Sequence, residues 1–221
     1  MSTPTKTDAI TTIRKAFAAM GAPSDPLKKT GPGKIYEAWT LVTILENLQM
    51  QEGVRVTVHG GSTMRFRASH GPIDKRFTWL ECRSATQSFE IWTDIEVLSL
   101  SHNRRPGTQT RPVDGDKHEL DIVAVIPGIT GHPRHDEILW GIECKHTTFS
   151  KAFHRSMLGM RRELSMYRGL PQPTSFITYP AADVESDPPS VLTAFSTDPT
   201  VIRFQPAGDA WDITYAHLPM P

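Results

Sequence analysis

One stretch limits the folds open to this chain more than any other: residues 120–126, which read LDIVAVI. Side chains alternate between the two faces of a strand, so both faces are apolar here apart from Asp121. A strand that is apolar on both faces belongs at the centre of a sheet with a layer on each side. The stretch therefore predicts a layered α/β fold, and it makes Asp121 an acid inside that fold.

Three segments have the apolar spacing of helices that could form such layers. They are 8–20, 34–50 and 150–168. In the second of them, Glu37 falls on the inward apolar stripe, four residues before Leu41, where a carboxylate is rarely without a partner. The alternative is a first-turn glutamate that the helix dipole favours.

The other regular segments indicate strands, except for a short helix expected near 189–196. We predict an α/β fold: a mixed central sheet flanked by helices, with an extended antiparallel meander before residue 101. Residues 1–33 would form an N-terminal helix and connector, and residues 34–221 the main part of a single globular domain. The predicted strands are 54–58, 64–67, 77–83, 89–97, 120–126, 138–146, 175–179, 200–205 and 211–216.

Composition narrows the setting and the partners. Lysine and arginine together number 24, as do aspartate and glutamate, so a nucleic-acid footprint would have to be local. Two cysteines, Cys82 and Cys144, are too few for a disulfide framework, which indicates a reducing compartment. The N-terminus is polar, unlike a signal peptide, and no apolar run reaches the roughly 20 residues of a membrane helix. We expect a cytoplasmic protein with no membrane partner.

The strand predicted after Asp121 carries the most unusual chemistry. Glu143 and Lys145 point to one face near its end, where an acid and a base are costly to desolvate. Together with Asp121 on the neighbouring strand they could form a Mg²⁺ site of oxygen ligands, to which the Cys144 backbone carbonyl could add and in which Mn²⁺ could substitute. Glu37 could reach the same place, and Lys145 could orient or activate a water. The alternative is an ordinary ion pair, because Glu-x-Lys also arises by chance.

The order of these features resembles the PD-(D/E)xK nuclease superfamily, which has the restriction-endonuclease-like fold. The likeness covers roughly residues 34–180. It is carried, in chain order, by Glu37, Asp121, Glu143-Cys144-Lys145 and the helix 150–168. The resemblance implies that Asp121 and Glu143 bind Mg²⁺. It also implies that Lys145 assists the attacking water and that Glu37 completes the site. The chain departs from the family where Leu120 replaces proline and where the meander lengthens the core.

Two other groups of residues imitate functional motifs. Glu81-Cys82-Arg83 has the spacing of the later triplet, but arginine stays protonated and cannot act as a base, so we interpret this triplet as lying on a solvent face. His132 and His135 lack the thiolate pair that would make zinc ligation convincing, so no zinc site is predicted.

Two basic segments are candidates for contact with nucleic-acid phosphates, which would carry no sequence information. The alternative is a solvated helix face and a set of loop charges. The candidate residues are Lys151, Arg155 and Arg162 on the helix 150–168, and Arg104 and Arg105 in the loop before the Asp121 strand.

These features together favour a Mg²⁺-dependent nuclease that hydrolyses phosphodiester bonds, most directly a DNA endonuclease. The resemblance adds restriction or anti-phage defence as a setting. A double-strand cut would need two such sites, hence a homodimer or a partner protein. Two alternatives stay open: a catalytically silent binding or scaffold subunit of a nucleic-acid-processing complex, and a nuclease directed at RNA rather than DNA.

Overall fold

A computed structural model of the chain describes residues 6–21, 31–61, 63–67, 69–103, 111–164, 190–200 and 213–220. The helices are α1 (Lys6–Ala19), α2 (Pro32–Glu52), α3 (Leu100–Asn103) and α4 (Lys151–Glu163). The strands are β1 (Arg55–His59), β2 (Trp79–Arg83), β3 (Ser88–Leu98), β4 (Lys117–Val125), β5 (Ile138–Lys145), β6 (Ser190–Phe195) and β7 (Ile213–His217). Short 3₁₀ turns at Asp114–Asp116 and His135–Glu137 lead into β4 and β5.

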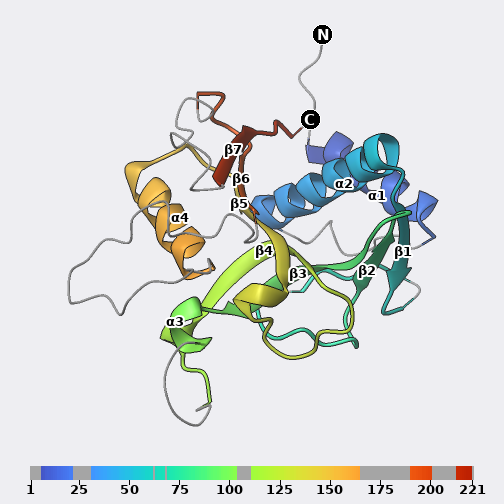
Figure 1. Cartoon of the computed structure of the whole chain (residues 1–221). Helices are drawn as coiled ribbons and strands as arrows, with labels where there is room; N and C mark the ends of the chain where they lie inside the picture. The colour runs from blue at the N-terminus through green and yellow to red at the C-terminus, as the bar shows by residue number, and fades with distance from the viewer. Residues whose placement is uncertain are drawn as a thin grey trace.

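The strands form one seven-stranded sheet in which spatial order follows chain order, β1 to β7 (Figure 1). Strands β1 to β5 are antiparallel neighbours, whereas β5, β6 and β7 run parallel. The predicted class, an α/β fold with a mixed central sheet and an antiparallel meander, is therefore confirmed at this level.

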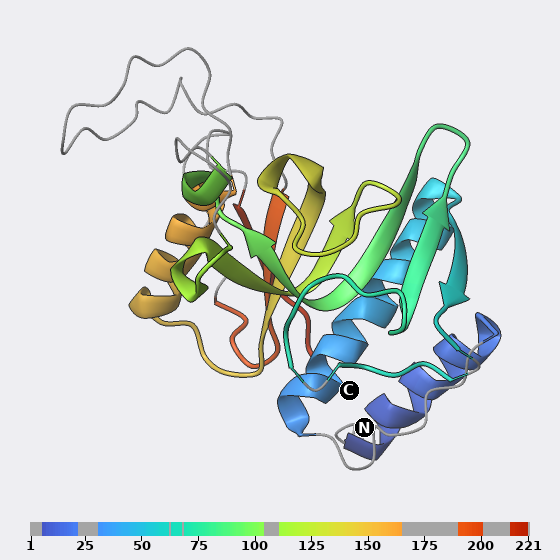
Figure 2. The same cartoon turned by 90° about the horizontal axis from the view of Figure 1, so that it is seen from below.

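Helices cover the two faces of the sheet, as the apolar pattern of residues 120–126 predicts. Ile122 and Ala124 belong to the apolar core that contains α1 and α2. Val123 and Val125 belong to the core on the other face, beneath α4. Figure 2 shows α2 along one side of the sheet and α4 on the other. The part of β4 from Leu120 to Val125 is thus covered on both faces, and its one acid, Asp121, lies within the layered part of the molecule.

Helix α1 packs against α2 rather than standing apart. Ile13 and Phe17 are fully buried in the same core as Leu41 of α2. The part of the predicted N-terminal segment that the structure describes therefore contributes to the main core. No described helix is long and apolar enough to cross a membrane.

The sequence prediction was wrong at two elements. The segment near 189–196 is strand β6 and not a helix, because it pairs in parallel with β5, for example Thr193 with Glu143. A short apolar run with β-branched residues does not reveal by its periodicity which structure it adopts. Residues 64–67 form no named strand; instead the Arg65 N–H donates to the Thr78 hydroxyl. The predicted strand 175–179 and residues 201–205 of the predicted strand 200–205 lie outside the described residues, as does the predicted helix beyond residue 164.

Gly60 ends β1 in a conformation and a space that suit only glycine. Its φ is +91°, and a Cβ there would lie 2.2 Å from the Phe77 carbonyl oxygen. Gly61 also has a positive φ of +132°, but a Cβ there meets nothing within 4 Å. We expect Gly60→Ala to lower the free energy of unfolding by at least about 2 kcal/mol more than Gly61→Ala, because only the first adds a clash with backbone. Urea denaturation measures both; equal losses would contradict the expectation.

Candidate metal centre

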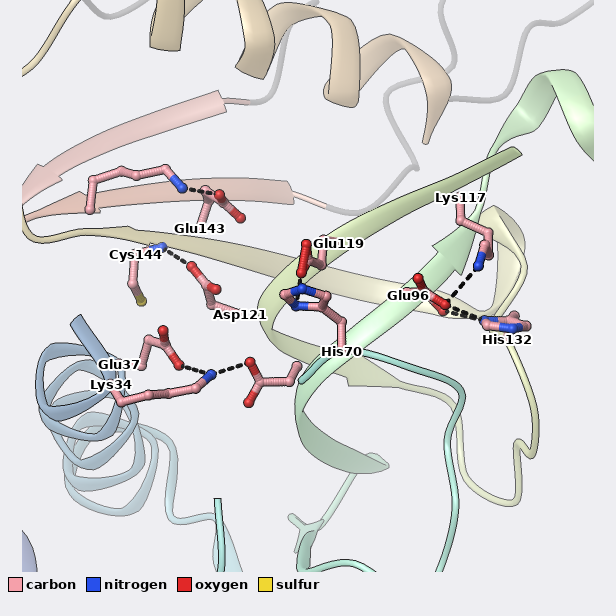
Figure 3. A network of polar contacts seen from close by, with 12 residues as sticks. Lys34, Glu37, His70, Glu96, Lys117, Glu119, Asp121, His132, Glu143 and Cys144 are labelled. Atoms are coloured by element: carbon pink, nitrogen blue, oxygen red, sulfur yellow. Dashed lines mark hydrogen bonds and ion pairs between the residues drawn. The ribbon is translucent and has the colours of Figure 1, made fainter. Parts of the chain in front are cut away.

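Three carboxylates from three separate elements converge at one place in the fold. Glu37 of α2, Asp94 of β3 and Asp121 of β4 each offer an oxygen, and these oxygens all lie within 4.8 Å of one another. Figure 3 shows Glu37 and Asp121 facing each other across the space between α2 and the sheet. Within the described residues, no other group of histidine, cysteine or acidic side chains converges in this way. We call these three residues the acidic cluster.

Strand register brings the two aspartates together. The β3–β4 register pairs Thr93 with Ile122 and Ile95 with Leu120, so Asp94 falls opposite Asp121. Asp94 has a φ of +55°, and it is the one non-glycine residue with positive φ in the described part of the chain. That conformation costs about 1–2 kcal/mol in an L residue. Such a residue persists only where its surroundings impose it, and it often marks a functional position.

Lys34 joins two members of the cluster. Its ammonium donates to Glu37 Oε2 at 2.5 Å and also to Asp94 Oδ1. The Asp94 side chain is only 2% exposed. Its second oxygen, Oδ2, is buried and has no hydrogen-bond partner among the described residues. One buried oxygen of this cluster residue therefore has no donor among the described residues, which is costly unless another partner, such as a bound cation, satisfies it.

Glu143 and Lys145 of β5 form an ion pair next to Asp121 of the cluster, whose charge acts on both of them. Continuing the β4–β5 register, which pairs Ile122 with Ile142, brings Asp121 opposite Glu143. Between Glu143 and Lys145 along the strand, the Cys144 N–H donates to Asp121 Oδ2 at 2.6 Å. The Lys145 ammonium lies 5.6 Å from the ring centroid of Phe153 on α4. The backbone of β5 therefore links the Glu143-Cys144-Lys145 triplet to Asp121.

Burial and mutual repulsion both raise the pKa values of these acids. Burial, and then the charge of Asp121, raise the pKa of Glu37 from 4.5 to about 8. The same two causes raise the pKa of Glu143 to about 7, against the opposing effect of Lys145. Burial also raises the pKa of Asp94. The charge of Asp121 thus acts on both Glu37 and Glu143, and Figure 3 shows Asp121 between them.

Formal charges explain this repulsion. Four carboxylates, those of the acidic cluster and Glu143, carry −4 when ionised, and the two lysines that pair with them return +2. When all four are ionised, a difference of −2 is left uncompensated by these side chains. In the metal-free protein, the proton that Glu37 holds below about pH 8 removes one unit of it. A single divalent cation carries the charge that would balance it.

Stability of the metal-free protein should depend on pH through Glu37. Between pH 4.5 and about 8 the folded protein holds a proton on Glu37 that the unfolded chain has released, so stability falls as pH rises through that window. We expect Glu37→Gln to remove about 1–3 kcal/mol of this loss between pH 5 and pH 8. Urea denaturation in EDTA at both pH values measures it. Parallel pH profiles for the wild type and Glu37→Gln would contradict the assignment.

The residues predicted to contact nucleic acid are not members of the acidic cluster. Lys151 and Arg155 are exposed on the first turns of α4, the helix whose Phe153 contacts Lys145. Arg162 belongs to the same helix, whereas Arg104 and Arg105 lie outside the described residues. A role for the Cys144 carbonyl as a ligand stays a prediction, since the contact that the structure adds is from the N–H of that residue.

The Glu81-Cys82-Arg83 triplet lies in a different part of the sheet from the acidic cluster. Glu81 pairs with Arg83 and contacts His59 at 3.0 Å, and both Glu81 and His59 are partly exposed. These strands, β1 and β2, form the end of the sheet opposite β7. The His132 ring contacts the backbone carbonyl and the carboxylate of Glu96. Neither group joins the acidic cluster.

Sequence reasoning missed two residues of the site, Asp94 and Lys34. Asp94 was assigned only to a strand, although an acid amid the apolar residues of that strand was an available signal. Lys34 precedes Glu37 by three residues, a spacing that joins side chains on one helix face, but such pairs are common on helix surfaces. Comparisons with family models, with curated proteins and with solved structures found no match to this chain.

Proposed function

We propose that this chain is a divalent-cation-dependent nuclease that hydrolyses phosphodiester bonds, with DNA as the favoured substrate. The observation that carries the proposal is the convergence of Glu37, Asp94 and Asp121 beside the Glu143–Lys145 pair. Carboxylates close together in a partly buried site, with a lysine next to them, are side chains suited to metal-assisted phosphodiester hydrolysis.

The donor set fits Mg²⁺, with Mn²⁺ as a substitute. The candidate ligands are hard carboxylate oxygens, and the buried Asp94 Oδ2 has no other partner among the described residues. Glu37, Asp94 and Asp121 would hold the ion. When bound, the ion supplies positive charge that stabilises the phosphate in the transition state and makes water more acidic.

Lys145 would act on the reacting groups from the β5 side. The Lys145 ammonium pairs with Glu143. Burial is the largest single influence on the pKa of Lys145 and lowers it, but the neighbouring negative charges, led by Glu143, outweigh burial, so the pKa is raised. A charged ammonium beside Asp121 can donate hydrogen bonds to a phosphate oxygen or orient the attacking water. Glu143, which pairs with Lys145 and is not part of the acidic cluster, can accept the proton that this water releases.

The arrangement of elements supports the family resemblance as part of the proposal. A helix with Glu37, then strands with Asp121 and Glu143, then the basic helix α4 follow in the order of a restriction-endonuclease-like core. In this proposal Lys151, Arg155 and Arg162 contact backbone phosphates, and Arg104 and Arg105, which precede β4 in the sequence and lie outside the described residues, add to these contacts. A cut through both strands would use two copies of the chain or a partner protein.

The direct test is cleavage of plasmid DNA and of structured RNA by the purified protein with Mg²⁺ or Mn²⁺. We expect DNA cleavage that EDTA abolishes and that Asp121→Asn and Lys145→Ala remove. Glu81→Gln is the matched control, because it alters the acid of the imitation triplet on β2. Cleavage of RNA alone would redirect the proposal to RNA. Inertness on both substrates, without stabilisation of the fold by either cation, would overturn the nuclease proposal and favour the scaffold role.

A further inference from the structure

Lys34 places its ammonium against two of the three carboxylates of the acidic cluster. It lies in the first turn of α2, three residues before Glu37. Its single ammonium donates both to Glu37 Oε2 and to Asp94 Oδ1, so two of the three clustered carboxylates share it. The lysine side chain is 23% exposed, whereas the Asp94 side chain is 2% exposed. One end of this contact can therefore move toward solvent and the other cannot.

A divalent ion among the three carboxylates would meet this ammonium at close range. The three carboxylate oxygens lie within 4.8 Å of one another, and Lys34 already touches two of the side chains. Two like charges at such a separation repel strongly in a partly buried site. Both cations cannot hold the same oxygens together.

We infer that Lys34 is an internal counter-ion that holds the acidic cluster together in the metal-free protein, and that a divalent ion binds by displacing its ammonium. The inference rests on the proposed metal centre. Lysine has a flexible four-carbon stem, so its head can leave while its Cα stays in α2. Asp94 keeps its place because it lies within a buried strand of the sheet.

The need to displace a lysine also favours divalent over monovalent ions at this site. A monovalent ion would bring no more charge than the ammonium that it replaces, whereas a divalent ion adds one unit toward the uncompensated −2 of the four acids. The contact of Lys34 with Glu37 and Asp94 therefore discriminates against Na⁺ and K⁺. It also limits the affinity for the divalent ion, because two ion pairs are lost when that ion binds.

The test is Mn²⁺ binding by isothermal titration calorimetry, without nucleic acid. Lys34→Met removes the ammonium but keeps an unbranched side chain, and it should bind Mn²⁺ at least about tenfold more tightly than the wild type. Lys117→Met is the matched control, because Lys117 also bridges two acids, Glu96 at 3.0 Å and Asp114 at 3.5 Å, and it should leave Mn²⁺ affinity unchanged.

The outcomes separate this inference from the proposed function. Mn²⁺ binding with equal or weaker affinity in Lys34→Met overturns the role of Lys34 alone. Absence of Mn²⁺ binding in both the wild type and Lys34→Met overturns the metal centre, and the proposed function with it.

A second measurement uses the wild type, in case Lys34→Met does not fold. An amine-acetylating reagent followed by peptide mass spectrometry reports the reactivity of each lysine with and without Mn²⁺. Mn²⁺ should increase acetylation of Lys34 several-fold, because the displaced amine leaves its two carboxylates, while Lys117 in the same sample stays constant. Unchanged or reduced acetylation of Lys34 at saturating Mn²⁺ would overturn the displacement.

Discussion

Asp121→Asn is expected to reduce metal-dependent cleavage by about 10³-fold or more, the largest effect of any single substitution in the chain. Asp121 lies between Glu37 and Glu143, and its charge raises the pKa of both. It also accepts the Cys144 N–H, which fixes its orientation. Asparagine keeps the size of the side chain but removes the negative charge that would bind the cation.

The same substitution should not destabilise the metal-free protein. Loss of the Asp121 charge removes a repulsion that Glu37 and Glu143 both experience, so we expect the pKa of each to move toward its ordinary value. Initial rates on plasmid DNA with Mg²⁺, together with urea denaturation in EDTA, check the two halves of the expectation. An Asp121→Asn protein that cleaves at a rate near that of the wild type would contradict the proposed metal centre.

Lys145→Ala is expected to lower the cleavage rate by about 10²-fold while the protein still binds Mn²⁺. The ammonium of Lys145 pairs with Glu143 and not with the acidic cluster, so its removal takes away a group that acts on water or phosphate rather than a metal ligand. The variant should also raise the pKa of Glu143 further, because the lysine is the main influence that opposes burial and Asp121 there.

Lys117→Ala serves as the control for Lys145→Ala. Lys117 is also a strand lysine in an ion pair, with Glu96, but that pair does not include the acidic cluster. Single-turnover cleavage rates and Mn²⁺ titrations of the two variants distinguish the roles. Loss of Mn²⁺ binding in Lys145→Ala would assign Lys145 to the integrity of the metal centre, and undiminished cleavage would remove it from the mechanism.

Part of the fold can be predicted from the sequence because local patterns of apolar residues determine it. The double-sided apolar run of β4 predicts its central position, and the structure divides its side chains between two cores. The apolar stripe of α2 places Glu37 toward the sheet, where the helix is observed to bury Leu41 and Leu45. Strand β6 could not be predicted in this way, because its six residues become a strand only by pairing with β5 and β7.

The sequence by itself determined that Asp121, Glu143 and Lys145 lie on adjacent strands and that Glu37 points inward from a helix. Alternation along a strand and periodicity along a helix are local rules, and they assign each side chain to a face. Only the tertiary structure decided that Asp94 and Lys34 belong to the same place. Asp94 reaches Asp121 through the β3–β4 register and a left-handed backbone conformation, and Lys34 reaches Asp94 across 60 residues of sequence. Distances between elements depend on how those elements pair and pack, and no local periodicity encodes them.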